Sequence, residues 1–423
     1  MLRAIARTYR EAFSGLPRPV WLLAAATLVN RSGTMVLPFL ALFLTQERGF
    51  TTPEAGRVLA LYGLGAVAGS WLGGWLCDRS DPKRVMGWTL SLTGVGFLLV
   101  GRVESRIWIA ILIVVLSLVG EAFRPASAAA LAAASGPANR TKSFALHRLA
   151  INVGMTLGPA LGGFLALYDY FWLFVVDGAT CLAAAVLLRL FFPAVQAEPE
   201  TAPAAATSAG SPWRDGPFLA MMVLVFLMAS VTFQEFSTFP LSLRRDFGFA
   251  ENRIGLAFSV NTLMVVLFEM VLVHSLAARD PLKVVGVGSL LFCLGFGLLP
   301  LGSGFAHVAF AVMVLSVGEM MSMPILSGVV ANRAEEGSRG RYMGLFMLAF
   351  SAAFVSAPLI GTWLYEGWGY KALWFGCGAL GLPLCLGFQV LALFMKKDRS
   401  RAVEPSPPSP LPPLQSPSPG EGG

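Results

Sequence analysis

Long apolar segments that recur along the chain decide what kind of fold it can adopt. An α-helix needs about 20 apolar residues to cross the hydrocarbon core of a bilayer, and many segments of this 423-residue chain reach that length. The composition agrees: 56% of the residues are hydrophobic and 13% are charged, against about 45–50% and about 25% in soluble domains. The sequence therefore predicts an all-α integral membrane protein.

Twelve such segments form two predicted six-helix bundles, 20–192 and 217–395, joined by a linker. The linker, 193–216, is rich in Ala and Pro and is typical of a flexible connector. Residues 1–19 place basic and apolar residues at helical spacing, which predicts an amphipathic helix at the membrane surface. A disordered tail is expected at 396–423. The predicted crossings are 20–45, 54–77, 84–102, 106–132, 143–167, 170–192, 217–242, 253–278, 282–303, 306–331, 341–365 and 370–395.

The distribution of Lys and Arg sets the expected orientation. With both termini on one side, the inner segments hold 21 of the 31 basic residues and the outer loops hold 8. Cytoplasmic loops are enriched in Lys and Arg, so we expect a multi-pass protein of the cell membrane with both termini in the cytoplasm. Topology then accounts for the formal charge of +7, and no nucleic-acid partner is expected.

The two halves repeat each other at an offset of 199 residues. GFTTPEAG, at 49–56, lines up with GFAENRIG, at 248–255. VLSLVGE, which ends at Glu121, matches VLSVGE, which ends at Glu319, with one residue dropped. Parallel repeats are typical of transporters whose halves rock around a site near the bilayer midplane. The alternative is a duplicated bundle that no longer transports.

Ionisable residues inside the predicted crossings are candidates for proton coupling or for the substrate cavity. Each costs about 2.5–3.5 kcal/mol on insertion scales, so a functional reason is expected for it. Glu121 and Arg124 stand three residues apart on one helical face and can pair, either as a functional pair or as a static one. Arg31 is expected to neutralise one of the acids. The full set is Arg31, Glu121, Arg124, Asp177, Glu235, Glu269 and Glu319.

Two of these acids have further expectations attached. Glu121 and Glu319 correspond in the repeat, so both are expected to face one central cavity from opposite halves. For Asp177 the alternative to a functional role is a helix contact. Carboxylates in a dry site tend to hold a proton and to exchange it when water or a cation approaches, which is the chemistry that proton coupling requires.

A charged turn between the second and third crossings, GWLCDRSDPKR, resembles the signature of the major facilitator superfamily, and the resemblance covers essentially the whole ordered chain. Asp81 and Pro82 replace the Gly and Arg that are usual in that pattern. The resemblance implies that Asp78 makes charge contacts that gate the cytoplasmic side. The alternative is that the charged cluster only sets the orientation of the chain in the membrane. The matching residues include Gly74, Asp78, Arg79, Lys83 and Arg84.

The fifth crossing contains NVGMTLGPALGG, which resembles the signature of the drug–proton antiporter branch of the same superfamily. Ala145 stands where the first Gly of that signature belongs. Glycines four residues apart let helices pack closely, and a proline removes a backbone hydrogen bond. The segment is thus either an exporter-type hinge or a packing seam. The matching residues are Gly154, Gly158, Pro159, Gly162 and Gly163.

These resemblances imply a 12-helix secondary active transporter that exports small amphipathic or cationic compounds in exchange for protons by alternating access. A proton-linked importer or exporter of a specific metabolite is the alternative. An integral-membrane enzyme is disfavoured because no metal motif such as H-E-x-x-H occurs. A channel is disfavoured because no selectivity filter is recognisable, and a primary pump because no ATP-binding loop is. No cofactor or metal is expected. The expected partners are a small-molecule substrate, protons and the bilayer, and the chain is expected to be a monomer.

Overall fold

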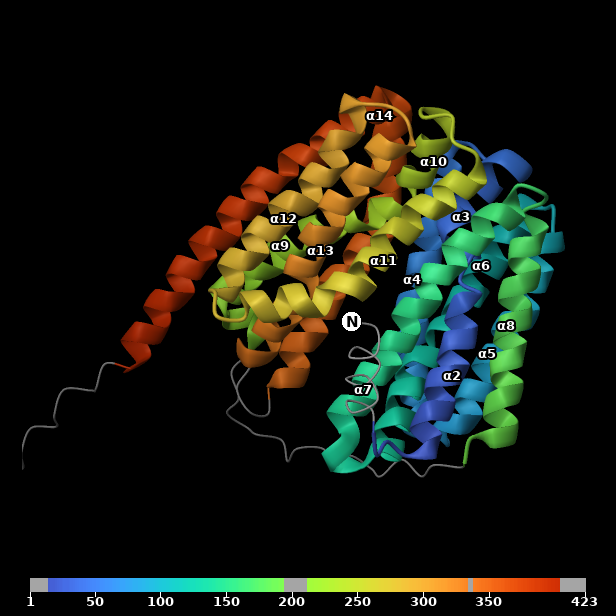
Figure 1. Ribbon diagram of the computed structural model, residues 1–423, viewed down its shortest axis with the longest axis horizontal. Coiled ribbons are helices and arrows are strands. Elements are labelled where there is room, and N and C mark those ends of the chain that lie inside the picture. The colour runs from blue at the N-terminus through green and yellow to red at the C-terminus, as the bar shows by residue number, and fades with distance from the viewer. Residues whose placement is uncertain (1–13, 194–210, 334–337, 404–423) are drawn as a thin grey trace, which may run out of the picture.

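The computed structural model describes residues 14–193, 211–333 and 338–403, and helices make up nearly all of this part of the chain (Figure 1). The predicted amphipathic segment before residue 14, most of the predicted linker and the tail after residue 403 lie outside the described residues. Eleven helical segments of the described chain are long and apolar enough to cross a membrane. The last of them, Gly340–Met395, has 56 residues, or about 84 Å of helix. It is divided at Gly369 (φ 80°, ψ 168°), so the predicted twelve crossings are confirmed.

The N-terminal half contains crossings one to six. Its fourth and fifth crossings meet at Gly136 (φ 64°, ψ 161°), inside the segment assigned to α7. The elements are α2 (Arg18–Ser32), α3 (Val36–Leu42), η1 (Phe43–Glu47), α4 (Thr52–Cys77), α5 (Pro82–Arg102), α6 (Arg106–Glu121), α7 (Phe123–Ala166) and α8 (Phe171–Phe191).

The C-terminal half contains crossings seven to twelve. The backbone of its last helix continues to Val403, beyond the predicted end of the bundle at residue 395. The elements are η2 (Pro212–Arg214), α9 (Gly216–Thr232), η3 (Phe233–Phe236), α10 (Thr238–Arg245), α11 (Glu251–Leu276), α12 (Pro281–Leu298), η4 (Leu299–Leu301), α13 (Phe305–Arg333) and α14 (Arg339–Val403).

The sequence repeat is also a structural repeat. The turn before α4 places Gly49 at φ 65°, and the turn before α11 places Gly248 at φ 67°. Only glycine adopts this left-handed region without strain. The same backbone hydrogen bond closes both turns, from Phe50 N–H to the Leu44 carbonyl and from Phe249 N–H to the Leu243 carbonyl, each at 2.9 Å. The helices that follow, α4 and α11, have 26 residues each.

Two crossings that the sequence predicts as single helices are broken. The first loses helical geometry between Ser32 and Val36, where α2 gives way to α3. The seventh narrows to a 3₁₀ turn at Phe233–Phe236 before α10 begins. Hydropathy along the chain does not report such breaks, because they depend on hydrogen bonds supplied by neighbouring helices.

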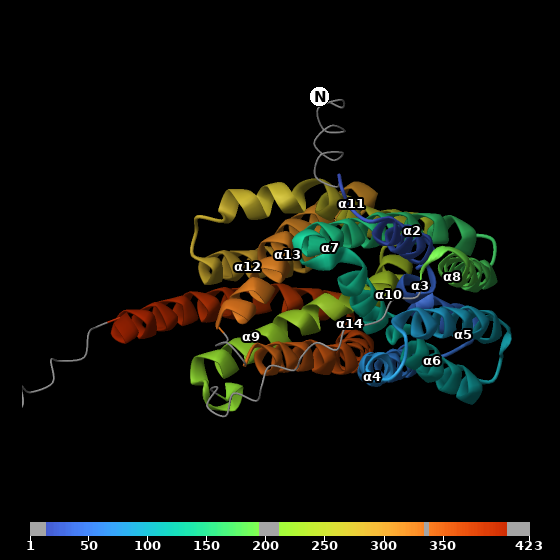
Figure 2. The ribbon, with the colours of Figure 1, turned by 90° about the horizontal axis from the view of Figure 1, so that it is seen from below.

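The two halves lie side by side, with α7 against α11 at one edge of their interface and α4 against α14 at the other (Figure 2). We call the face where α8 ends and α9 begins the linker face, and the face across the membrane the opposite face. The ribbons of the two halves converge at the opposite face and diverge towards the linker face (Figure 1).

Glycines at the start of α4 and α11 allow this convergence. A Cβ on Gly255 would stand 2.2 Å from the Pro159 carbonyl oxygen of α7. A Cβ on its repeat partner Gly56 would stand 2.7 Å from the Pro358 carbonyl oxygen of α14 and 2.1 Å from the Thr362 hydroxyl. The same close approach therefore occurs twice, at positions related by the repeat.

We expect Gly255→Ala to destabilise the protein by about 1–3 kcal/mol, because overpacking against a backbone atom forces the helices apart. Gly376→Ala is the matched control, since a Cβ there meets nothing within 4 Å, and alanine is the better helix former. The free energy of unfolding, measured by titration from mild detergent into sodium dodecyl sulfate, should fall only for the first variant. Equal effects of both variants would contradict the close contact.

Candidate functional site

A cavity of about 140 Å³ lies within the N-terminal half, bounded by residues of α2 and α3, α4 to α8 and the break between α2 and α3. Most of its wall is apolar, as is usual for small-molecule sites. A few polar side chains stand among the apolar ones. The polar lining includes Asn30, Arg31, Tyr62, Thr93, Glu121 and Asp177.

Asp177, which is 3% exposed, holds the broken first crossing together. Its two carboxylate oxygens accept hydrogen bonds from the Met35 and Val36 N–H groups, each at 3.0 Å. These groups begin α3 and have no partner within the helix, and a negative charge is favourable at a helix N-terminus. Asp177 therefore makes the helix contact that was the alternative for this residue.

Glu121 and Arg124 form the ion pair that their spacing predicts, at 3.5 Å between Oε2 and Nη1. The Glu121 side chain is 22% exposed and lines the cavity. Arg124 is 68% exposed and is not part of the lining. The pair thus ties an acid of the cavity wall to a cation outside it.

The predicted pairing of Arg31 with one of the acids is wrong. Arg31 lines the cavity but forms no ion pair with any residue that the structure describes. Its Nε is buried and has no hydrogen-bond acceptor. The helix rotation that would bring it to Glu121 or Asp177 is not the one that packing selects.

The glycines of the fifth crossing form a packing seam. A Cβ on Gly154 would stand 2.5 Å from the Arg31 Cβ, one on Gly158 2.7 Å from the Thr34 carbonyl oxygen, and one on Gly162 2.9 Å from the Met35 Cβ. The fourth, Gly163, faces the other way and packs against the backbone of Glu251 in α11. The chain stays helical through Pro159. The seam is therefore what this arrangement displays, and the hinge stays a prediction.

The C-terminal half gathers acids instead. Glu319 lies near the middle of α13 and accepts a hydrogen bond from the Asn261 side-chain amide at 2.8 Å, and the same amide nitrogen is 3.1 Å from the Ser316 hydroxyl. Glu235, in the 3₁₀ turn of the seventh crossing, is close enough to Glu319 for the two charges to repel. Within the described chain neither carboxylate has a Lys, Arg or His at ion-pair distance.

The two repeat-related acids do not both line the cavity of the N-terminal half. Glu121 lines the cavity of the N-terminal half, and Glu319 does not. Their neighbours also differ at equivalent positions, because Tyr62 of α4 corresponds to Asn261 of α11 at the same 199-residue offset. The repeat therefore preserves the position of an acid but not its surroundings.

Glu269 makes an ion pair between the halves. Its carboxylate receives a short hydrogen bond from the Arg148 guanidinium of α7. Glu269 is 11% exposed at its side chain and Arg148 is 56% exposed, in the part of the interface nearer the linker face. The sequence singled out the acid but not the arginine, which lies on the other half.

The charged turn between α4 and α5 lies at the linker face. Asp78 is exposed, and its side chain makes no hydrogen bond or ion pair with the described residues. A Cβ on Gly74 would meet nothing within 4 Å. Arg79 stacks on Trp75, with 4.2 Å between its Cζ and the ring centroid. Lys83 donates to the Phe192 carbonyl, and Arg84 is exposed. The gating contacts of Asp78 stay a prediction.

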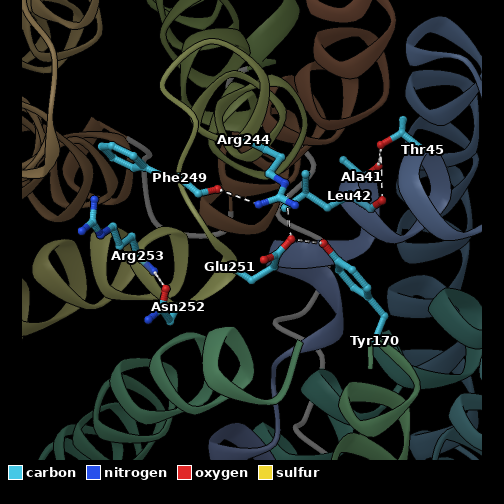
Figure 3. Close-up of polar contacts among 9 residues, drawn as sticks. All are labelled: Ala41, Leu42, Thr45, Tyr170, Arg244, Phe249, Glu251, Asn252 and Arg253. Atoms are coloured by element: carbon cyan, nitrogen blue, oxygen red, sulfur yellow. Dashed lines mark hydrogen bonds and ion pairs between the residues drawn. The ribbon is translucent and has the colours of Figure 1, made fainter. Parts of the chain in front are cut away.

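Polar contacts at the opposite face join the two halves (Figure 3). Glu251, at the start of α11, is 5% exposed and lies between Tyr170 of the N-terminal half and Arg244 of α10. The Tyr170 hydroxyl donates to Glu251 Oε1 at 3.0 Å, and Arg244 Nε lies 3.5 Å from the same oxygen. Burial and the neighbouring carboxylate raise the pKa of Tyr170, so it remains a neutral donor.

A second polar contact between the halves lies across the same face. Arg245 of α10 donates to the Thr52 hydroxyl of α4 at 2.6 Å and lies 3.8 Å from Glu366. Sequence reasoning missed these residues and Asn261. The repeat was the available signal, because Thr52 and Glu251 begin equivalent helices at the same offset.

Comparisons with known proteins identify the chain's relatives. The family model described as Major Facilitator Superfamily matches residues 21–242 and 236–418. The chain is similar to a Na⁺, Li⁺, K⁺/H⁺ antiporter of Planococcus maritimus, with 23% identity over 83% of this chain and 91% of the relative. It is also similar to the class D tetracycline resistance protein of Salmonella ordonez, with 26% identity over 82% and 90%. A crystal structure of the nucleoside transporter NupG aligns with a TM-score of 0.78 and 13% identity, covering 88% of this chain and 100% of that one.

We expect Asp177→Asn to destabilise the protein by about 1–3 kcal/mol, because the amide nitrogen cannot accept from one of the two N–H groups, of Met35 and Val36, and a buried hydrogen bond to a charged acceptor is lost. The same unfolding titration measures the loss, and Glu319→Gln serves as the control that removes an acid without a cap. A fully stable Asp177→Asn protein that has lost only proton coupling would instead make Asp177 a proton carrier.

Proposed function

Because the chain belongs to the major facilitator superfamily, and is therefore a membrane transporter of small molecules, we propose that it exchanges protons for small amphipathic or cationic compounds and exports them. The two relatives support exchange and export, since one is an H⁺ antiporter by name and the other a tetracycline resistance protein. We place it in the cell membrane, with the linker face and both termini on the cytoplasmic side, as the basic residues indicate.

The observation that carries this proposal is the pair of acids in the C-terminal half. Glu235 and Glu319 are near enough to repel each other when both are ionised, and no cation of the described chain neutralises either. Two unpaired negative charges at membrane depth are costly, and like charges in one site disfavour double ionisation. We therefore assign the exchangeable proton to this pair.

Asn261 makes the two acids of the pair unequal. Its amide donates to Glu319 and so stabilises the charged form of that carboxylate. Glu235 has no such donor among the described residues. A cationic substrate that reaches the pair supplies the missing positive charge and favours release of the proton. Proton and cation then compete for the same acids, which is the basis of exchange.

The arrangement of the halves supports alternating access. Their contacts at the opposite face are short and involve backbone atoms of Gly56 and Gly255, whereas the ribbons diverge towards the linker face. We interpret the structure as the state that opens to the linker face. In the other end state the polar contacts of Glu251 and Arg245 break and the linker face closes.

We expect Glu319→Gln to abolish proton movement coupled to substrate while the protein still folds and inserts. The measurement uses proteoliposomes with an internal pH dye and a panel of cationic dyes and tetracycline. Glu104→Gln is the control, because Glu104 is an exposed acid between α5 and α6. The sign of the pH change separates exchange from co-transport.

Two outcomes would overturn parts of the proposal. Normal coupled flux by the Glu319→Gln protein removes the proton from this residue. A pH change in the direction of co-transport rejects exchange and favours a proton-linked importer.

A further inference from the structure

The cavity of the N-terminal half has one charge without a partner. Three side chains of its lining belong to Asp, Glu or Arg: Asp177 accepts from the Met35 and Val36 N–H groups, and Glu121 pairs with Arg124. Arg31 alone has no ion pair in the described chain. Among these three side chains, the one that has neither an ion pair nor a capping contact within the described chain is therefore the cation.

Hydrogen-bond donors of the cavity wall also lack acceptors. Four buried side-chain nitrogen or oxygen atoms in the described chain have no partner, and two of them, Arg31 Nε and Thr93 Oγ1, belong to residues that line this cavity. Thr93 is 8% exposed. A buried donor without an acceptor costs about 1–3 kcal/mol, and more when it is charged. A ligand that supplies acceptor oxygens recovers this free energy.

Packing fixes the position of the Arg31 Cβ, from which the side chain extends. The Arg31 Cβ is pressed against Gly154 of the seam, where no side chain fits. The arginine therefore leaves α2 on the side that packs against α7, and its side chain also lines the cavity. An arginine held in this way presents a planar fork of donors, which matches a carboxylate with two parallel hydrogen bonds.

We propose that Arg31 and Thr93 form a subsite that binds a carboxylate group of the transported compound. Pockets for drug-sized molecules have volumes of about 300–1,000 Å³, so a cavity of 140 Å³ receives one group of the substrate and not the whole of it. The rest of the molecule extends towards the C-terminal half.

The subsite narrows the substrate class. The cavity of the N-terminal half thus offers a positive charge, and the C-terminal half offers two acids without a cation, Glu235 and Glu319. A compound that satisfies both has a carboxylate at one end and an amine at the other. The substrate class is thus zwitterionic, and the amine end rests on the proposed exchange at the acids, whereas the carboxylate subsite stands on the N-terminal half alone.

Charge-selective labelling tests the sign of the cavity without any transport. Met155 lines the cavity, so Met155→Cys, made after replacement of the five native cysteines by alanine, provides the reporter. The probes are two methanethiosulfonates of similar size, one carrying a sulfonate and the other a trimethylammonium group. The measured quantity is the rate of labelling by the sulfonate reagent divided by the rate of labelling by the cationic one. We expect this ratio to be at least about tenfold higher in the Met155→Cys protein than in the same protein with Arg31→Gln.

Matched variants separate this effect from general charge and from misfolding. Arg57→Gln removes an exposed arginine of α4 and should leave the ratio unchanged. Arg31→Lys keeps the charge and should keep most of the ratio. Size-exclusion profiles show whether each variant folds. Three results would overturn the subsite: faster labelling by the cationic reagent, a labelling ratio that is unchanged in Arg31→Gln, or no labelling by either reagent in a folded protein.

Protection by small probes tests carboxylate binding itself. Benzoate should slow labelling of the Met155→Cys protein by uncharged N-ethylmaleimide, whereas benzylamine should not. Arg31→Gln and Thr93→Val should each weaken the protection several-fold. Failure of benzoate at millimolar concentration, or equal protection by benzylamine, rejects the subsite. Neither measurement needs a proton gradient, so loss of proton coupling in Glu319→Gln and loss of carboxylate binding are separate results.

Discussion

The absence of water in the bilayer core constrains this structure more than any single contact. Each backbone polar group and each charge inside a crossing must find its partner within the protein. At the break in the first crossing, the partner is the Asp177 carboxylate. At the break in the seventh, Gln234 donates to the Ala357 carbonyl at 2.9 Å and accepts from the Thr238 hydroxyl at 2.8 Å. The first break is thus capped by a side chain of α8, and the second is tied to α14 by a side chain of its own.

The same constraint explains why the glycines cluster where the broken crossings pack. Gly154, Gly158 and Gly162 let α7 approach residues 31–35, and Gly361 lets α14 approach Gln234. In the membrane there is little hydrophobic gain from bringing helices together, so close packing and hydrogen bonds provide the association. A broken helix held by a glycine seam is a natural place for a substrate site, because its polar groups are close to an open cavity.

The repeat gives the two halves one architecture and two different chemistries. Equivalent turns, helix starts and glycine contacts recur across the interface. Within the described residues of the N-terminal half, however, Glu121 pairs with Arg124 and Asp177 caps α3, while Arg31 has no ion pair. In the described C-terminal half, Glu235 and Glu319 have no cation at ion-pair distance. Duplicated halves that rock against each other need matching shapes, but a coupled transporter needs the proton and the substrate to be treated differently.

The sequence alone determined that the chain spans a membrane twelve times, that its halves repeat, and which residues place charge at membrane depth. These properties depend on segment length, on hydropathy and on the offset between the repeats, all of which can be read from the order of the residues. The tertiary structure decided that Asp177 is a helix cap, that Glu269 pairs with Arg148, that Arg31 has no ion pair within the described residues, and that the cavity of the N-terminal half is lined by Glu121 but not by Glu319. Each of these depends on how one helix is rotated and broken against another. Packing across the bundle fixes that rotation, and no local window of sequence contains it.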